Sequence, residues 1–164
     1  MTDPRALEAV RRDLHARLLR SISTAGLERA ALELGFDEQD RRHVEDFAIY
    51  EVRELGLTAA ERLLQHHDLD SLSRTVLEAM VRARFVILEI DEVVDGAGVR
   101  GRDMLAETPC FVADAQLSRT VSVGDLLATR LLTFDDFSLT TGAELRFDRS
   151  LAPTILEICE RVVI

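Results

Sequence analysis

The residues that could act as nucleophiles lie apart from the residues that could activate them. Ser118, Ser122 and Cys110 fall in the second half of the 164-residue chain, whereas all four histidines fall in the first half. A nucleophile–histidine–acid triad would therefore need a histidine from the first half to reach into the second. The chain carries 30 carboxylates, so two of them meeting by chance is expected and indicates little. We expect no catalytic residues and no enzymatic activity.

The patterns that suggest cofactor chemistry are incomplete. Residues 96–101 read Gly-x-Gly-x-x-Gly, but a dinucleotide site needs these glycines to open a helix, and Pro109 interrupts the short stretch that follows. A glycine-rich hairpin with a bulge fits the pattern better. Asp91 and Asp95 have the spacing of a calcium loop, but Arg102 stands where that loop needs a bidentate acid. We expect no bound cofactor.

The histidines and cysteines do not form a metal-binding set. His66 and His67 are neighbours on a predicted helix, where side chains point about 100° apart and cannot easily share one metal. His15 and His43 lie beside charged residues on predicted helices, and we expect both at the surface. The two cysteines are far apart in the chain and neither belongs to a Cys-x-x-Cys motif. We expect no metal site and two reduced, buried thiols.

Five polar residues stand at the ends of predicted strands or in turns: Arg102, Asp103, Ser118, Arg119 and Asp125. Residues of these types commonly tie loops together through hydrogen bonds and ion pairs, and this is the interpretation we favour. The alternative is that they contact a ligand or a partner. They are our candidate contact residues.

Charge and hydropathy argue against two classes of partner. The net charge is −10, and the two halves of the chain, divided after Arg82, carry −4 and −6. An acidic surface disfavours nucleic acid and anionic membranes, although a local arginine patch remains compatible with these totals. The apolar run at 85–88 ends at Glu89, far short of the roughly 20 residues that span a bilayer. Residues 1–5 begin no apolar signal segment, so we expect a cytoplasmic protein.

Helical periodicity dominates the first half. Asp3 and Pro4 are typical of a helix start, and this helix should extend to about Ile22 with Leu7, Val10, Leu14 and Leu18 on its buried face. Ser23 or Thr24 should begin the next helix, and others follow at about 38–54, 59–67 and 72–82. Leu-Gly at 34–35 and 55–56 is followed each time by a capping residue and an acid. This pattern suggests a helical repeat or ordinary helix ends, and we favour the latter because no longer period recurs.

The second half changes to short apolar runs separated by turn residues. Strands are predicted at 85–94, 109–113, 126–134, 137–140 and 144–147, followed by a helix at 153–163. The predicted fold class is therefore α+β, with a helical region at 1–82 and an antiparallel sheet or small barrel with a C-terminal helix at 83–164. No linker composition separates the regions, and we expect them to pack as one unit.

Residues 46–147 resemble a family of uncharacterised bacterial proteins, many of which carry a SEC-C zinc motif elsewhere in the chain. The similar segments, in order, are 46–50, 58–64, 77–79, 84–89, 102–105, 118–119, 123–130 and 139–142. The similar proteins often have a glycine in the turn where this chain has Glu107-Thr108-Pro109, and the SEC-C cysteines are absent here. The resemblance implies the helical-then-β architecture and implies no activity.

Because no reactive groups converge in the sequence, we expect a non-catalytic protein–protein interaction or adaptor protein that binds an unknown protein partner. A second copy of the chain is one candidate for that partner. Helical hairpins can offer grooves for such a partner. The alternative is a small-ligand-binding or regulatory module in the β-half, near Arg102 and Arg119.

Overall fold

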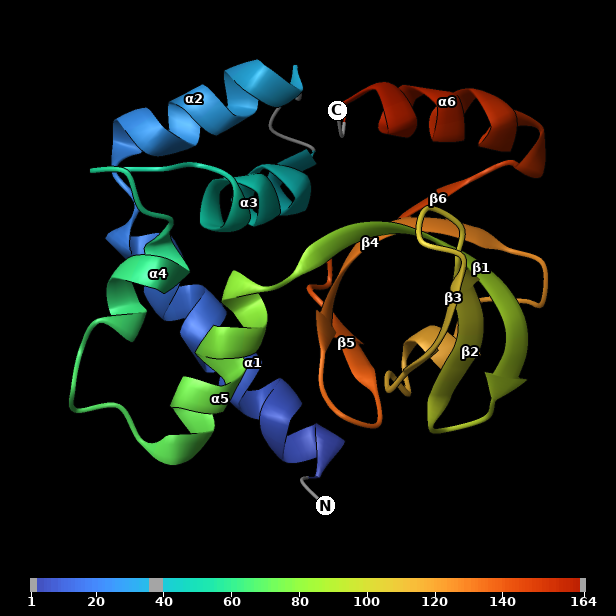
Figure 1. The fold of residues 1–164 in the computed structure, drawn as a ribbon, viewed down its shortest axis with the longest axis horizontal. Helices are drawn as coiled ribbons and strands as arrows, with labels where there is room; N and C mark the ends of the chain where they lie inside the picture. The colour runs from blue at the N-terminus through green and yellow to red at the C-terminus, as the bar shows by residue number, and fades with distance from the viewer. Residues whose placement is uncertain (1–2, 36–39, 163–164) are drawn as a thin grey trace. The chain divides into compact units, whose positions relative to one another are not determined.

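The chain has the predicted α+β architecture, with helices first and a β-barrel after them (Figure 1). The computed structural model describes residues 3–35 and 40–162. They divide into a helical unit, Met1–Ala83, and a barrel unit, Arg84–Ile164. No helix in these described ranges is both long enough and apolar enough to cross a membrane.

The first helix, α1 (Pro4–Ser21), begins and ends close to the predicted positions. The Asp3 carboxylate accepts a hydrogen bond from the backbone N–H of Arg5, and proline opens the helix. Three of the four predicted face residues are buried, but the fourth buried position is Arg11 rather than Val10. The Arg11 guanidinium binds both carboxylate oxygens of Glu8, at 2.8 and 2.7 Å, which partly compensates the cost of burying the charge.

The other helices of this unit are α2 (Thr24–Leu34), α3 (Arg41–Tyr50), α4 (Ala59–Leu64) and α5 (Ser71–Val81). Ser23 caps α2, and Gly35 ends it in the left-handed conformation with φ of 64°. Thr58 and Glu61 form the predicted capping box of α4. Helix α1 contacts α3, α4 and α5, and α2 packs on α3.

Helix α3 is shorter than the predicted helix at 38–54. Residues 38 and 39 lie outside the described ranges, and the helix ends at Tyr50. Glu54 and Leu57 instead form an isolated antiparallel bridge around Leu55 and Gly56, both of which have positive φ. Gly56 therefore belongs to a tight turn rather than to a helix end, because its partners are the residues of that bridge.

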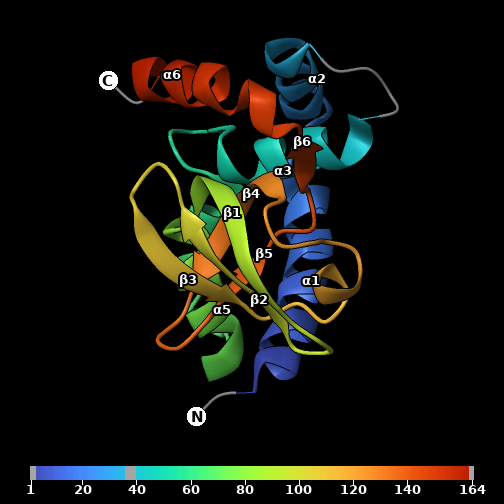
Figure 2. The same cartoon turned by 90° about the vertical axis from the view of Figure 1, so that its right-hand side faces the viewer.

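The barrel unit contains β1 (Arg84–Val94), β2 (Gly98–Asp103), β3 (Thr108–Val112), β4 (Leu126–Thr133), β5 (Ser138–Thr140) and β6 (Leu145–Phe147). The order β1-β2-β3-β5-β4 closes into a barrel because β4 also pairs with β1. Strands β1, β2 and β3 follow one another as antiparallel hairpins (Figure 2). The Gly-x-Gly-x-x-Gly segment forms the β1–β2 hairpin, with a bulge between Ile90 and Glu92, as the bulged-hairpin interpretation predicts.

The β-half forms the small barrel that the sequence predicts, with one parallel pair among its antiparallel pairs. Strands β3 and β5 run parallel and meet at the pair Val112 and Ser138. The chain passes through the short 3₁₀ helix η2 (Leu117–Arg119) and through β4 before it returns as β5, so β5 has the same direction as β3. Strand β6 pairs with the other end of β4.

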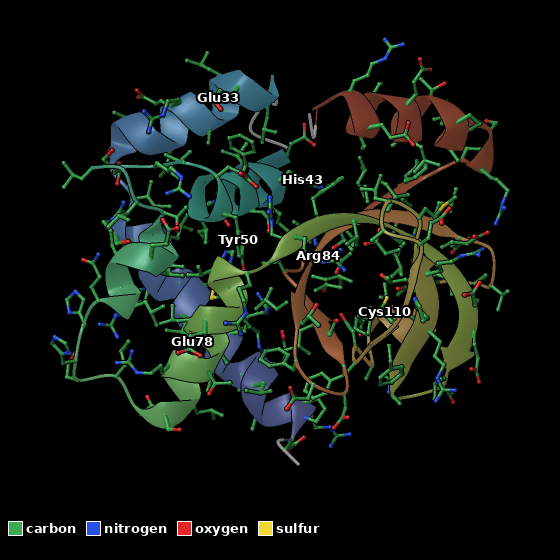
Figure 3. All side chains as sticks on the ribbon, viewed as in Figure 1. Glu33, His43, Tyr50, Glu78, Arg84 and Cys110 are labelled. Atoms are coloured by element: carbon green, nitrogen blue, oxygen red, sulfur yellow. The ribbon has the colours of Figure 1, made fainter. Side chains whose placement is uncertain are left out.

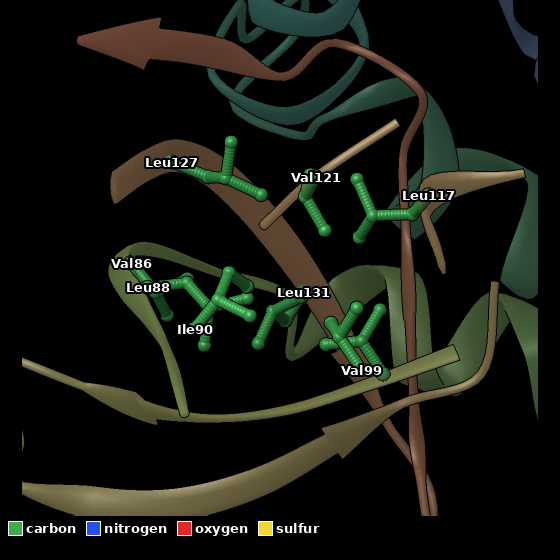
Figure 4. Packing of buried hydrophobic residues seen from close by; sticks show 9 residues of the cluster. Val86, Leu88, Ile90, Val99, Leu117, Val121, Leu127 and Leu131 are labelled. Atoms are coloured by element: carbon green, nitrogen blue, oxygen red, sulfur yellow. The ribbon is translucent and has the colours of Figure 1, made fainter. Parts of the chain in front are cut away.

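The barrel interior is filled by aliphatic side chains (Figure 4). Nine buried residues form this core: Val86, Leu88, Ile90, Val99, Val112, Leu117, Val121, Leu127 and Leu131. Gly101 allows β1 and β2 to approach closely, because a Cβ there would stand 2.3 Å from the carbonyl oxygen of Glu89. After β6, the 3₁₀ helix η3 (Arg149–Leu151) leads into α6 (Ala152–Val162).

Candidate functional site

Arg102 and Asp103 are adjacent in sequence but act on opposite faces of β2, as neighbours on a strand must. Asp103 is buried, and its carboxylate accepts hydrogen bonds from the Arg84 guanidinium at 3.0 Å and from the backbone N–H of Leu105 at 3.0 Å. Asp103 thereby connects the start of β1 to the turn after β2. Arg102 is exposed and donates to the carboxylate of Glu89 on the neighbouring strand at 3.3 Å.

Ser118 and Asp125 each hold a loop of the barrel unit. The buried Ser118 hydroxyl donates to the carbonyl of Ala115 at 2.8 Å and accepts from the N–H of Gly96 at 3.2 Å, so it joins η2 to the β1–β2 turn. The Asp125 carboxylate accepts from the N–H of Ser122 at 2.9 Å and closes the turn before β4. Arg119, in η2, presents an exposed side chain.

Glu89 is the centre of an ionic cluster that sequence reasoning missed. Its carboxylate binds two guanidinium groups, those of Arg102 and of Arg149 in η3, which also reaches the carbonyl of Gly124. The hydrogen bond from Arg149 is the main reason that the pKa of Glu89 lies below its ordinary range. A signal was present in the sequence, since Glu89 is the acid that interrupts the apolar run of this strand.

The outer face of β2 and β3 carries a small basic and aromatic patch. Arg100 stands opposite Phe111 in the β2–β3 register, and its guanidinium lies 5.8 Å from the centre of the phenyl ring. Arg100 also pairs with Glu92 at 3.1 Å, and Arg102 lies two residues further along the same face. We call Arg100, Arg102 and Phe111 the arginine–phenylalanine patch.

The helical unit contains a second cluster, which we call the Glu54 clamp. The Glu54 carboxylate accepts hydrogen bonds from the backbone N–H and the hydroxyl of Ser23 at the start of α2, and it pairs with Arg62 of α4 at 3.1 Å. The bond from the Ser23 hydroxyl is the largest cause of the lowered pKa of Glu54. A Cβ on Gly26 would stand 2.8 Å from the same carboxylate, so glycine leaves the room that the clamp occupies.

Residues next to the Glu54 clamp connect it to the capping box of α4. Arg53 pairs with Glu61 at 2.9 Å and donates to the carbonyl of Gly56, while Arg62 donates to the carbonyl of Leu57 at 3.0 Å. Here these residues brace the loop between α3 and α4, which is a structural role.

His15 and His43 are half-buried, so the expectation that both lie at the surface is wrong. His15 Nε2 lies 3.9 Å from a carboxylate oxygen of Glu45, because α1 packs against α3. Burial is the main cause of the lowered His15 pKa, and the neighbouring Arg11 lowers it further. His15 is half-buried because α1 packs against α3, a helix distant from it in sequence.

The two cysteines are free thiols and half-buried rather than fully buried. Cys110 packs against the aliphatic core of the barrel and lies within the ring of strands (Figure 3). Burial raises the pKa of its thiol, which favours the unreactive protonated form. Within residues 3–35 and 40–162, no group of three or more His, Cys, Asp or Glu side chains is placed to hold a metal ion.

The segment from β6 to α6 exposes three large apolar side chains in close succession. Leu145 is 50%, Leu151 51% and Ile158 56% exposed. Among the described side chains of α6, Ala152 is the fully buried one, and the main contact of the helix is with η3. We call residues 145–158 the apolar C-terminal segment.

The comparisons with known proteins identify a family without an assigned activity. No curated protein and no solved structure matches the chain. Residues 5–163 match the profile described as Family of unknown function (DUF7986), and the chain therefore belongs to this family.

Proposed function

We propose that this protein is a non-catalytic protein–protein interaction protein, an adaptor, and that its apolar C-terminal segment docks into a groove on a protein partner. The observation that carries the proposal is the exposure of Leu145, Leu151 and Ile158 within 14 residues. Isolated exposed apolar residues are ordinary, but a cluster of them at the surface is typical of an interaction site.

The amphipathic pattern of α6 supports a helix-in-groove contact. Ile155, Ile158 and Cys159 recur at the i, i+3 and i+4 positions of one helix face. Glu157 and Arg161 pair with each other and are exposed. A helix of 11 residues is about 16 Å long, which limits the area that it can bury by itself. Because a stable interface buries about 800 Å² on each partner, a groove that also takes Leu145 and Leu151 suits this segment better than a simple pair of α6 helices.

The test compares Ile158→Glu with Glu160→Gln, a matched change outside the apolar face. Both tagged variants and the wild type are purified from the native host, and bound proteins are quantified by mass spectrometry. Ile158→Glu should lower recovery of the partner by about tenfold or more, the effect of losing one anchoring side chain. Glu160→Gln should retain the partner, and both variants should keep the wild-type melting temperature.

Sedimentation velocity on the same three proteins measures homo-oligomerisation. A dimer that Ile158→Glu dissociates would identify a second copy as the partner. The proposal fails if Ile158→Glu keeps both the wild-type set of bound proteins and the wild-type oligomeric state.

The arginine–phenylalanine patch supports a second candidate, a small-ligand-binding or regulatory module. Five-stranded Greek-key barrels commonly bind ligands on the outer face of their second and third strands, which is where Arg100 and Phe111 stack. A ligand that binds the folded state must raise the melting temperature. A thermal-shift screen with nucleotides and oligonucleotides should therefore give a rise that Arg100→Ala with Phe111→Ala abolishes, and a flat screen would remove this candidate.

The proposal includes a location in the cytoplasm of a bacterium. The resemblance of residues 46–147 to uncharacterised bacterial proteins supports the source, and the free thiols of Cys110 and Cys159 suit a reducing compartment. The zinc chemistry of the SEC-C motif is not part of the proposal, because this chain lacks those cysteines.

A further inference from the structure

The turn between α3 and α4 presents a leucine in an unusual way. Glu54 and Leu57 exchange two backbone hydrogen bonds, 3.0 and 3.2 Å long, and thereby close a two-residue turn. The two central residues, Leu55 and Gly56, have φ of 55° and 82°. Positive φ at both central positions is the geometry of a type I′ turn, whose usual residues are Asn, Asp and Gly. The Leu55 side chain is 98% exposed.

Leucine is unfavourable at this position for two independent reasons. A bulky L-residue with positive φ brings its Cβ close to its own backbone, which strains the chain. In addition, an almost fully exposed leucine leaves its whole apolar surface in water. Packing inside the chain relieves neither cost, because a side chain with 98% exposure makes almost no contacts. Glu107 shares the positive φ but has a polar side chain, whereas Leu55 combines the strain with an exposed apolar side chain, and this combination points to a function outside the fold.

The Glu54 clamp holds this turn in one position. Glu54 is tied to Ser23 and Arg62, and the guanidinium of Arg53 binds the carbonyl of Gly56. Arg29 of α2 donates to the carbonyl of Arg53 at 3.2 Å. The two residues before Leu55 and the one after it are therefore anchored to α2 and α4. Figure 1 shows the connection between α3 and α4 as a loop that projects from the helices it joins. Because the backbone on both sides of Leu55 is already held in place, little backbone entropy is lost when the leucine is bound.

We propose that Leu55 is an anchor residue that inserts into an apolar pocket of a protein partner. This interaction surface lies in the helical unit and is separate from the apolar C-terminal segment. A buried apolar anchor surrounded by polar contacts is the usual arrangement of a binding hot spot. The protein would then have one docking element in each unit, as a protein that bridges two partners requires.

The charges around the turn favour a protein pocket rather than a lipid membrane as the binding partner of Leu55. Insertion of one leucine into a bilayer is weak and needs neighbouring free cations that bind anionic headgroups. The three guanidinium groups nearest the turn, those of Arg29, Arg53 and Arg62, are already bonded to carbonyls and carboxylates of the clamp. The first half of the chain carries a net charge of −4. A protein pocket that closes around the side chain needs no such cations.

The first experiment measures the melting temperatures of three variants at position 55. Leu55→Asn and Leu55→Gly relieve the backbone strain, so each should melt about 2–4 °C above the wild type. Leu55→Ala is the matched control, because it removes the side chain and keeps the strain, and it should melt within about 1 °C of the wild type. A lower melting temperature for both Leu55→Asn and Leu55→Gly would show that the leucine stabilises its own fold, and this would overturn the proposal.

The second experiment places a photoreactive benzophenone side chain at position 55 of the full-length protein in its native host. The control carries the same group at Leu32, which is 82% exposed on a regular helix. The proposal expects one discrete adduct with a different protein from position 55 alone. Excess unlabelled wild type should suppress it at least tenfold more effectively than excess Leu55→Asn.

Two outcomes of the crosslinking, and one outcome of a separate vesicle-binding measurement, would contradict the proposal. The same adducts from positions 32 and 55 would indicate a non-specifically adhesive surface, and an adduct between two copies of the chain would identify self-association. Binding of the wild type, but not of Leu55→Asn, to vesicles of phosphatidylcholine and phosphatidylglycerol would identify a membrane. Each of these results leaves the test of Ile158 unaffected, so the two proposals fail separately.

Discussion

Two of the polar side chains predicted at strand ends or in turns of the barrel unit are buried and stabilise the fold. Asp103 and Ser118 were candidate contact residues, and in the fold both are buried and hydrogen-bonded to backbone groups. Buried polar groups are costly to leave unpaired, so the large effects of substitution should fall on stability. Arg102 and Arg119 are the exposed members of the set, and Arg102 is also bonded to Glu89.

Asp103→Ala should lower the free energy of unfolding by about 2 kcal/mol or more. The substitution removes a hydrogen bond to the charged Arg84 and leaves the N–H of Leu105 without its acceptor. Arg84→Ala should also be destabilising, by about 1–3 kcal/mol, because it leaves the buried Asp103 carboxylate without its cation. Urea unfolding measures both values, and a loss below about 0.5 kcal/mol for Asp103→Ala would contradict the buried structural role of Asp103.

Glu107→Gly should raise the free energy of unfolding by about 0.5–1 kcal/mol. Glu107 is exposed in the turn between β2 and β3 and has φ of 54°, a conformation that glycine adopts without steric cost. Glu107→Ala keeps the strain and should leave stability nearly unchanged. Equal changes in the free energy of unfolding for Glu107→Gly and Glu107→Ala would show that the backbone at Glu107 is not strained.

At the scale of elements, the Glu54 clamp explains why α3 does not continue through residue 54. Residues 51–57 lie outside the helix, where Glu54 binds the capping residue Ser23 of α2 and Leu55 and Gly56 turn the chain back toward α4. Periodicity alone predicted a helix through 54. This prediction was wrong because local periodicity does not register the contacts of Glu54 with Ser23 and Arg62, which are distant in sequence.

Gly26→Ala tests the Glu54 clamp, because the clamp predicts that this substitution lowers stability where it would ordinarily raise it. Alanine normally stabilises a helix interior by about 1 kcal/mol relative to glycine. Here the new Cβ would meet the Glu54 carboxylate at 2.8 Å and Ile22 at 2.9 Å, so we expect destabilisation instead. In the background of Glu54→Ala the cost of Gly26→Ala should shrink by about 1 kcal/mol, as a double-mutant cycle can measure. Additive effects would show that the two residues do not share this space.

At the scale of the whole molecule, stability should fall in two steps as the pH is lowered. His15 has a folded-state pKa below its ordinary value of 6.5, so the unfolded chain takes up a proton that the folded protein does not. Stability is therefore lost as pH falls below about 6.5. The folded-state pKa values of Glu54, Glu61 and Glu89 are also lowered, by hydrogen bonds, so their contribution is full above about pH 4.5 and is lost below it.

Urea unfolding of the wild type and of His15→Gln between pH 3 and pH 8 separates these steps. The variant should lose the decline that begins near pH 6.5 and should keep the decline below about pH 4.5. Parallel curves for the two proteins across the upper range would show that His15 does not titrate differently in the folded and unfolded states.

The sequence by itself determined the α+β class and most of the elements with their approximate bounds, but it predicted no separate strand at β2 and extended the third helix past Tyr50. These features depend on local periodicity, caps and turn residues, such as Asp3, Gly35 and the Thr58–Glu61 capping box, whose partners are near in sequence. Only the tertiary structure decided which side chains meet. The closure of β4 on β1, the parallel contact of β3 with β5, the ion pairs of Glu89 with Arg149 and of Glu54 with Arg62, and the exposure of Leu55 all depend on how the chain packs in three dimensions. Local patterns do not encode these distances, because packing energy is shared among residues far apart in the chain.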